Sequence, residues 1–307
     1  MTAPPSPPPT DTRAGFVALI GAPNSGKSTL LNALVGAKVS IVSRKVQTTR
    51  APIRGIALEG GAQLVFIDTP GMFAPRRRLD RAMVDAAAAS AGDADIVLLL
   101  VDAVKGIDPD VERILDSLAK ASAPRVLVLN KIDRLKKERL LALAADLTKR
   151  LSFTDTFMIS ALDGSGVADL RAHLARVVPE GPWHYPADEI TDANERTTAA
   201  EITREKIYEH LHDELPYQTT VETTAWKELR DGGVRIEQTV FVERESQRRI
   251  VLGEKGHTVK QISMEARTEL SQMFERPVHL FLFVKVRENW ENDPERYREM
   301  GLEFPKE

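Results

Sequence analysis

A glycine-rich segment near the N-terminus carries residues suited to binding phosphate. Residues 21–28 read Gly-Ala-Pro-Asn-Ser-Gly-Lys-Ser and fit the pattern G-x-x-x-x-G-K-[ST]. In this pattern backbone N–H groups surround phosphate oxygens and a helix N-terminus adds partial positive charge. Lys27 would bridge the β- and γ-phosphates, and the Ser28 hydroxyl would ligate Mg²⁺. Contacts to a nucleotide are expected from Gly21, Ala22, Pro23, Asn24, Ser25, Gly26, Lys27, Ser28 and Thr29.

The alternative for this segment is an ordinary glycine turn capped by Ser28. It is disfavoured because an apolar run precedes the segment and a helical pattern follows it, which is the context that the pattern requires.

A second polar segment, Asp68-Thr69-Pro70-Gly71, directly follows an apolar run. At the carboxyl end of a strand, the Asp68 carboxylate would lie beside the phosphate loop and act on Mg²⁺ through water. The Gly71 N–H would hold the γ-phosphate. We therefore expect nucleotide contacts from Asp68, Thr69, Pro70 and Gly71.

A third segment, Asn130-Lys131-Ile132-Asp133, predicts which base is bound. A carboxylate at Asp133 accepts hydrogen bonds from N1–H and the exocyclic amine of guanine, whereas adenine presents a lone pair there and is repelled. Asn130 would tie this loop to the phosphate loop, and the Lys131 stem would cover one face of the base. Guanine O6 would be held by backbone N–H groups after the last apolar run, those of Ser160, Ala161 and Leu162. A plain strand-ending loop is the alternative.

The order of these segments is similar to that of translation-factor-type GTPases across residues 14–178. Residues 45–50, Lys-Val-Gln-Thr-Thr-Arg, lie where the first switch of that class belongs. The resemblance implies that one threonine hydroxyl binds Mg²⁺ when the γ-phosphate is present. We favour Thr49, which directly precedes the arginine, and Thr48 stays open as the alternative. The metal ligands implied are Ser28, Thr49 and Asp68, and the catalytic residues implied are Lys27, Thr49 and Gly71.

One departure concerns hydrolysis. The residue after Gly71 is Met72, where Ras-like enzymes have the glutamine that orients the attacking water. A thioether neither accepts the proton of that water nor donates to it strongly. The chain thus resembles the hydrophobic-substituted class of GTPases. Asn24 matches an asparagine that resembles a K⁺ ligand in that class, so the resemblance implies slow, K⁺-stimulated hydrolysis of GTP to GDP and phosphate.

The second half of the chain holds Gly253-Glu254-Lys255-Gly256 between an apolar run and a helical pattern. KH modules clamp about four nucleotides with such a Gly-x-x-Gly loop. Between Arg244 and Arg267, six Lys or Arg stand against three Glu, net +3. A solvated loop in a structural domain is the alternative. The expected RNA contacts are Arg248, Arg249, Gly253, Glu254, Lys255, Gly256 and Lys260.

The elements that must position these segments follow from periodicity. Continuous apolar runs separated by helical patterns are typical of a doubly wound, mostly parallel α/β sheet covered on both faces. This pattern covers residues 14–178. The expected strands are 16–20, 64–67, 96–101, 126–129 and 156–159, and the expected helices are 27–35, 79–90, 109–119, 138–147 and 167–177.

The pattern changes at the turn-rich residues 179–195, which predict a linker. Residues 196–307 then predict an α+β module: a helix over 197–212, a hairpin over 219–229 and 234–243, a short apolar run over 250–252, a helix over 258–273 and a strand over 278–286. With its Gly-x-x-Gly loop, this order resembles a type II KH domain. Residues 1–13 predict a disordered tail, since five of the first ten residues are proline.

Length and composition set outer limits. A chain of 307 residues favours two domains, and the absence of cysteine excludes disulfides, thiol nucleophiles and cysteine-ligated metals. The apolar runs are far shorter than the ~20 residues that span a bilayer. Residues 1–180 carry 24 basic and 19 acidic side chains, and residues 181–307 carry 18 and 26. RNA binding by the acidic half must therefore be concentrated near its loop, with help from Arg76-Arg77-Arg78 of the basic half.

Both halves together resemble the Era family of bacterial ribosome-assembly GTPases, within the TrmE–Era–EngA-like superfamily. The resemblance covers residues 14–300 and includes residues 43–50, 214–217, 243–247, 277–280 and 284–290. It implies binding to the 3′ end of 16S rRNA and the 30S subunit, in small-subunit biogenesis, by a monomer in the cytoplasm with peripheral association with the inner membrane. Small departures are Ser25, where valine is usual, and Met264, where a small residue is common.

Three other functions stay open. A two-G-domain assembly GTPase is disfavoured by the single phosphate loop, and a P-loop kinase would not need Asn130-Lys131-Ile132-Asp133. An RNA-binding protein with a degenerate nucleotide site is the third alternative.

Overall fold

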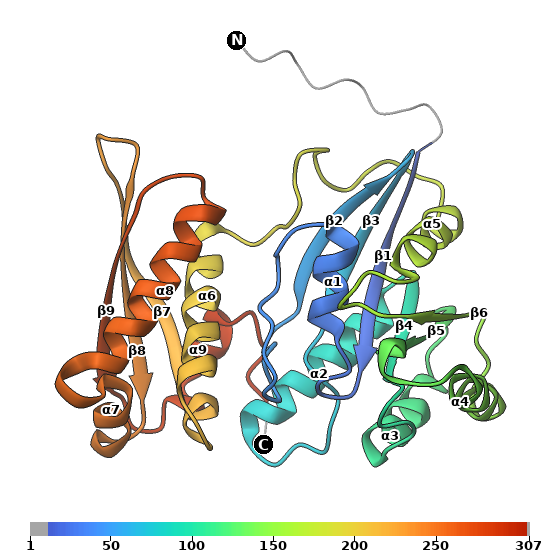
Figure 1. The fold of residues 1–307 in the computed structure, drawn as a ribbon, viewed down its shortest axis with the longest axis horizontal. Coiled ribbons are helices and arrows are strands. Elements are labelled where there is room, and N and C mark those ends of the chain that lie inside the picture. Colours follow the sequence, from blue (N-terminus) through green and yellow to red (C-terminus); the bar gives the residue numbers. More distant parts are fainter. Residues whose placement is uncertain (1–11, 306–307) are drawn as a thin grey trace, which may run out of the picture. The chain divides into compact units, whose positions relative to one another are not determined.

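The computed structural model describes residues 12–305, which divide into two compact units (Figure 1). The first unit holds residues 12–40, 49–192 and 298–305 of the described range. The second holds Ile41–Thr48 and Ala193–Tyr297. Most of the predicted tail lies outside the described residues, and the first strand begins at Arg13, the last residue assigned to that tail. The predicted KH region extends to residue 307, whereas the described residues 298–305 group with the first unit.

The first unit is built on a six-stranded sheet with the order β2-β3-β1-β4-β5-β6. Neighbouring strands in this sheet are parallel, except that β2 is antiparallel to β3. The doubly wound, mostly parallel sheet is therefore confirmed. The strands are β1 (Arg13–Gly21), β2 (Ile53–Glu59), β3 (Ala62–Asp68), β4 (Ile96–Asp102), β5 (Arg125–Asn130) and β6 (Asp155–Ile159). Of the six strands in this sheet, β2 is the one that no predicted apolar run covers.

Helices cover both faces of this sheet. Alternate residues of a strand point to opposite faces, and in β1 both sets are buried: Val17 and Leu19 in one apolar cluster, Ala18 and Ile20 in another. This two-sided burial explains why the strands read as continuous apolar runs. Helices α1 (Lys27–Val35) and α5 (Val167–Val177) supply the first cluster, and the second is supplied by α2 (Arg78–Asp93), α3 (Pro109–Leu118) and α4 (Lys137–Arg150).

The predicted linker is bound along the first unit. The side-chain oxygen of Gln63 accepts the N–H groups of His184 (2.8 Å) and Tyr185 (3.0 Å), and its amide nitrogen donates to the Tyr185 carbonyl (2.8 Å). Farther along, the Ile56 N–H donates to the Ile190 carbonyl at 2.8 Å. These hydrogen bonds satisfy backbone groups of the linker and one N–H group of the edge strand β2, and the segment belongs to the first unit up to Asp192.

The second unit has a three-stranded sheet, β7-β8-β9, in which β8 pairs antiparallel with β7 and parallel with β9. Helices α6 and α8 pack on it around Ala199, Ile202, Ile236 and Leu270. This order confirms the type II KH architecture. The elements are α6 (Glu195–His210), β7 (Thr220–Glu228), β8 (Val234–Val242), α7 (Glu245–Leu252), α8 (His257–Met273), β9 (Val278–Val286) and α9 (Pro294–Glu299).

Across residues 12–305, we find no helix that is both long enough and apolar enough to cross a membrane.

Candidate nucleotide site and nucleic-acid interface

The phosphate loop lies where the sequence predicts it, between the end of β1 and the start of α1. Lys27 is the first residue of α1 and is buried, and its Nζ donates to the carbonyls of Gly21 and Ala22, each at 3.1 Å. Burial lowers the pKa of Lys27 to about 8, against the opposing effect of the Asp68 charge. A cation held this weakly by two neutral carbonyls is ready to pair with phosphate oxygens.

Gly26 and Asn130 hold the loops for phosphate and base together. The Asn130 Nδ2 donates to the Ser25 carbonyl at 2.8 Å, and its Oδ1 accepts the Ala161 N–H at 2.9 Å. Gly26 has φ +100°, and a Cβ on it would lie 2.3 Å from the Asn130 Nδ2. Glycine is required there because a side chain would both strain the backbone and displace Asn130. The predicted tie between the two loops is confirmed.

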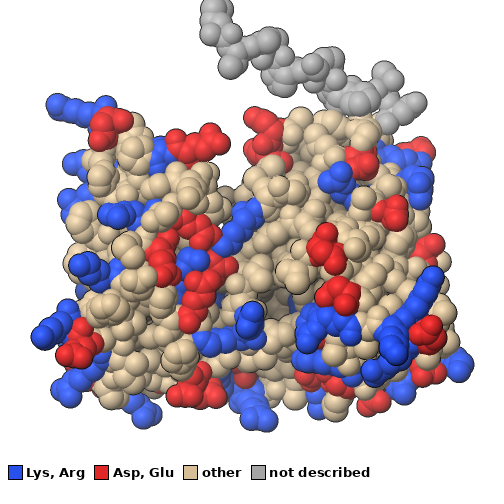
Figure 2. Space-filling view, in the orientation of Figure 1, with Lys and Arg blue, Asp and Glu red and all other residues tan. Residues whose placement is uncertain are grey.

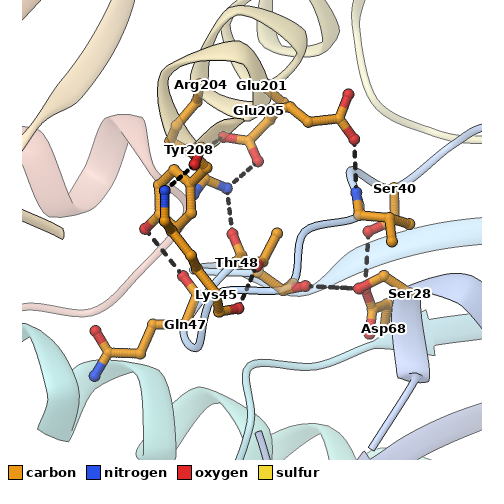
Figure 3. Close-up of polar contacts among 12 residues, drawn as sticks. Ser28, Ser40, Lys45, Gln47, Thr48, Asp68, Glu201, Arg204, Glu205 and Tyr208 are labelled. Atoms are coloured by element: carbon orange, nitrogen blue, oxygen red, sulfur yellow. Dashed lines mark hydrogen bonds and ion pairs between the residues drawn. The ribbon is translucent and has the colours of Figure 1, made fainter. Parts of the chain in front are cut away.

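Four side-chain oxygens converge beside Lys27 at the end of β3. The Asp68 Oδ2 accepts hydrogen bonds from Ser28 (2.7 Å), Ser40 (2.8 Å) and Thr49 (3.1 Å), and the hydroxyls of Ser28 and Thr49 lie 3.0 Å apart. Figure 3 shows Ser28, Ser40 and Asp68 around this point. Asp68 is fully buried, and its Oδ1 has no hydrogen-bond partner within residues 12–305. Burial raises the pKa of Asp68, and the Lys27 charge opposes that rise.

This oxygen cluster fits a small divalent cation. Carboxylate and hydroxyl oxygens are the donors that Mg²⁺ prefers, and the unpartnered Oδ1 leaves lone pairs for a cation or its water. The structure brings Thr49, and not Thr48, to Ser28 and Asp68. The Thr48 hydroxyl instead donates to the Lys45 carbonyl at 2.9 Å.

The Asp68-Thr69-Pro70-Gly71 turn is fixed against the phosphate loop. The Thr69 hydroxyl donates to the Leu19 carbonyl at 2.7 Å, and the Met72 N–H donates to the Gly21 carbonyl at 3.2 Å. A Cβ on Gly71 would lie 3.0 Å from Pro23. The Met72 side chain is buried in an apolar cluster with Ala22, so it supplies neither charge nor a hydrogen bond to water.

The segment predicted to bind guanine, residues 130–133, contains one acidic side chain, Asp133, and one basic side chain, Lys131. Asp133 is exposed in the short helical turn Ile132–Arg134. Lys131 has φ +68°, and its Nζ lies 2.7 Å from both the Asn24 carbonyl and an Asp102 carboxylate oxygen. Asp102 escaped the sequence analysis, although an acid at the end of an apolar run was a usable signal. Its carboxylate helps to hold the Lys131 ammonium beside the phosphate loop.

The loop after β6 has two of its three predicted amides engaged. The Ser160 N–H donates to the Ser165 carbonyl at 2.9 Å, and the Ala161 N–H donates to Asn130. The side chain of Leu162 is 84% exposed. Of the three amides, that of Leu162 is therefore the one best placed to meet a base.

Residues 41–48, which contain part of the predicted first switch (residues 45–50), are held by α6 of the second unit (Figure 3). The Glu205 carboxylate accepts the Val42 N–H at 2.8 Å, and the Tyr208 hydroxyl donates to the Gln47 carbonyl at 3.3 Å. The Lys45 Nζ donates to the carbonyls of Tyr208 and Leu211 at the end of α6. A lysine at the carboxyl end of a helix is stabilised by the helix dipole. No pattern in the sequence predicted this packing.

The Gly-x-x-Gly loop joins α7 to α8. Gly253 has φ +72°, and a Cβ on it would lie 2.2 Å from the Thr258 hydroxyl, so only glycine fits. Gly256 (φ +79°) and Lys255 (φ +52°) share the left-handed conformation, and α8 begins at once after the loop. Backbone N–H groups at the start of a helix are suited to phosphate.

The cations around this loop do not all face solvent. Arg249, Lys255 and Lys260 are exposed, and Glu254 is exposed with them. Arg248 instead donates to the Val284 carbonyl at 3.1 Å and pairs with Glu245. Figure 2 shows Lys and Arg interspersed with Asp and Glu on the face drawn, in keeping with a local rather than a diffuse basic surface.

Ile250 was not predicted as a functional residue, because the sequence places it in a short apolar run. Its side chain is nevertheless 58% exposed on α7, next to the loop. An exposed apolar side chain beside a phosphate-binding loop offers a surface for an unstacked base.

Comparison with known proteins supports both halves of this site. Residues 16–131 match the family described as 50S ribosome-binding GTPase, and residues 214–291 match the KH domain family. The chain is similar to GTPase Era of Bradyrhizobium sp. (strain ORS 278), with 62% identity over 96% of each chain. It is 64% identical to GTPase Era of Afipia carboxidovorans, again over 96% of each.

Solved structures show the same likeness. A crystal structure of Aquifex aeolicus Era bound to GDP·AlF4⁻ aligns with a TM-score of 0.90 and 37% identity, covering 94% of this chain and 99% of the other. A crystal structure of Era in complex with MgGDPNP and nucleotides 1506–1542 of 16S ribosomal RNA aligns with the same score, identity and coverage.

Proposed function

The chain belongs to the Era family of GTPases, and on that premise we propose that it binds and hydrolyses GTP and binds the 3′ end of 16S rRNA through its KH domain. The observation that carries this proposal is the convergence of the phosphate loop, Asp68 and Asn130 at one edge of the sheet, in a chain that also carries a Gly-x-x-Gly loop. This combination disfavours the kinase alternative, because a kinase has no need of the guanine loop.

Each part of the nucleotide has a group to meet it. The backbone of residues 21–26 and the Lys27 ammonium would hold the phosphates, and Asp133 would accept from the guanine edge. The residues that would hold Mg²⁺ are Ser28, Thr49 and Asp68, whose oxygens already lie within 3.1 Å of one another. The ion, when bound, offsets the charge of the β- and γ-phosphates. Gly71 lies close against Pro23, and its N–H group would donate a hydrogen bond to the γ-phosphate.

We propose that hydrolysis is slow and stimulated by K⁺, because Met72 is buried and cannot orient water. Asn24 is the residue proposed to bind the monovalent ion. It takes φ +62° in the phosphate loop, a conformation that asparagine tolerates well. We further propose a role for the protein in small-subunit biogenesis, as a monomer in the cytoplasm with peripheral membrane association.

GTP turnover is expected to be faster in KCl than in NaCl at equal ionic strength, by about tenfold or more, since a fixed positive charge near the transferred phosphoryl group has effects of that order. Phosphate release measured in the two salts checks this. Asn24→Gly keeps the positive φ while removing the amide oxygen, so this variant should lose the difference between the salts. Equal turnover of the unmodified protein in Na⁺ and K⁺ would refute the K⁺ proposal.

Reversing two charges at the Gly-x-x-Gly loop, Lys255→Glu with Lys260→Glu, is expected to weaken binding to a 16S 3′-end oligonucleotide by on the order of tenfold or more. Both side chains are exposed, so folding should be unaffected. Each lost phosphate contact should also lower the slope of log Kobs against log salt by about 0.7. GTP hydrolysis should not change. Fluorescence anisotropy at several salt concentrations measures both quantities.

The matched control carries the same change of net charge elsewhere: Lys120→Glu with Lys149→Glu, two exposed lysines of the first unit. It should bind the oligonucleotide like the unmodified protein. Equal losses in the two double variants would mean that the attraction is diffuse, and unchanged binding by the loop variant would remove the loop from the RNA interface.

A further inference from the structure

A third hydroxyl contacts Asp68, and it comes from outside the segments with a nucleotide pattern. Ser40 lies in the loop between α1 and β2, its side chain is 1% exposed, and its Oγ donates to the Asp68 Oδ2 at 2.8 Å. A buried hydroxyl whose donor is directed at a buried carboxylate is more than a filler of space, because an apolar residue would leave that acceptor less satisfied.

The position of Ser40 is fixed by one side chain of α1. The Asn32 Oδ1 accepts the N–H groups of Val39 and Ser40, both at 2.9 Å, and its Nδ2 donates to the Ser40 carbonyl at 2.8 Å. Asn32 follows Ser28 by four residues and so lies on the same face of α1. The helix that presents Ser28 thus also holds the backbone of Ser40 on both its donor and its acceptor.

One oxygen of Asp68 accepts hydrogen bonds from three hydroxyl groups, and we expect these hydroxyls to have different roles. Ser28 and Thr49 are the two assigned to the metal under the proposed function. When those hydroxyls bind a cation, the hydrogen bond from Ser40 is the one of the three that remains to orient the carboxylate. The carboxylate is fully buried and its other oxygen is unpartnered among the described residues, so the loss of this donor would not be compensated by bulk water.

We propose that Ser40 and Asn32 are a positioning pair for the divalent cation: Ser40 orients the Asp68 carboxylate, and Asn32 holds Ser40. This inference rests on the proposed Mg·GTP function, and it concerns positioning residues, since neither side chain is assigned a contact with nucleotide or metal.

The test compares nucleotide binding with and without Mg²⁺. For Ser40→Ala, the Mg²⁺ concentration that half-maximally tightens binding of a fluorescent GDP should rise about tenfold or more, while the affinity measured in EDTA stays within about twofold. Asn32→Ala should give the same separation, and the double variant should be no worse than either single one, as expected for residues that act as one unit. Ser40→Thr, which keeps the hydroxyl, should retain most of the Mg²⁺ dependence.

The control is Ser90→Ala, which removes a hydroxyl that donates within α2, to the Ala86 carbonyl. It should match the unmodified protein in both conditions. Should Ser40→Ala fail to fold, Ser40→Cys keeps nearly the same volume with a weaker donor and replaces it in the comparison. An unshifted Mg²⁺ titration in a folded Ser40 variant would overturn the proposal. If Mg²⁺ failed to tighten GDP binding in the unmodified protein, this result would contradict the proposed Mg·GTP function, and with it the positioning role of Ser40 and Asn32.

Discussion

Lys27→Met is expected to weaken GTP and GDP binding by about 10²- to 10³-fold while making the nucleotide-free protein more stable. The ammonium is buried against two carbonyls and beside Asp68, and burial lowers its pKa to about 8. Methionine has a similar length and volume without the charge. The lowered pKa corresponds to about 3 kcal/mol of unfavourable charge burial at neutral pH. Two hydrogen bonds to carbonyls are lost in exchange, so the net gain should be about 1–2 kcal/mol.

The sign of the pH dependence distinguishes this explanation from a packing effect. The pKa of Lys27 in the folded protein is about 8 and in the unfolded chain 10.5. Between these values the unfolded state binds more protons, so Lys27 makes the free energy of unfolding rise with pH across that window. Below pH 8 the full penalty is present, and above pH 10.5 it is gone. Lys27→Met should therefore be most stabilising at and below neutral pH.

Urea unfolding of the nucleotide-free protein at several pH values, together with titration of a fluorescent GDP, measures both effects. A variant that binds GDP as tightly as the unmodified protein would contradict the role of Lys27 in holding the phosphates. An unmodified protein that binds no GDP would show that the nucleotide site is degenerate. A variant that is destabilised equally at pH 7 and pH 10 would contradict the role given to charge burial, because a simple packing defect does not titrate.

Asp133→Asn is expected to reduce the preference for GTP over ATP by about 10³-fold or more. A site built to pair with a substrate group rejects the analogue that lacks it by about 10⁴, because a buried partner is left unpaired. Under the proposed function, the carboxylate would accept from both guanine N–H groups. An amide accepts from only one of them, and its NH₂ group can donate to the N1 lone pair of adenine. GTP affinity should fall and ATP affinity should rise.

Competition of GTP and ATP against a fluorescent GDP measures this preference. Asp146→Asn, which neutralises a largely exposed acid on α4, is the matched control and should leave both affinities unchanged. A variant that keeps the original preference would show that the base is read elsewhere, for instance by the amide of Leu162.

The sequence predicted the parts of the fold that follow a local rule. Strands buried on both faces read as continuous apolar runs, and the phosphate loop has a fixed spacing between strand and helix. Strand β2 was missed because it contains the exposed Arg54 and a glycine at position 55. That glycine has a tertiary cause: a Cβ there would lie 2.7 Å from Leu31 and 2.8 Å from Val35 of α1. Glycine looks like a strand breaker until the helix above it is known.

The sequence predicted the residues that would contact nucleotide and metal, but it did not predict the residues that hold them in place. Ser28, Asp68 and Asn130 belong to segments with fixed spacing, and the structure brings them together as expected. Ser40 contacts Asp68 from a loop, and Asp102 contacts Lys131 from the end of β4; neither residue belongs to a segment with such a pattern. The choice between Thr48 and Thr49 also required the structure, since adjacent residues point in different directions and the sequence does not say which faces Asp68. Likewise, Lys45 binds main-chain carbonyls, which any sequence would present.

The packing of residues 41–48 on α6 also has a consequence for synthesis of the chain. About 150 residues separate this segment from Glu195, where α6 begins. At translation rates of about 5–20 residues per second, the segment emerges roughly 8–30 seconds before the helix that will bind it. During that interval Ile41, which ends up buried among Ala199 and Ile202, has no folded partner. Nascent chains arrested between residues 100 and 190 should therefore be cleaved by protease at residues 41–48, and the full-length protein should resist cleavage there.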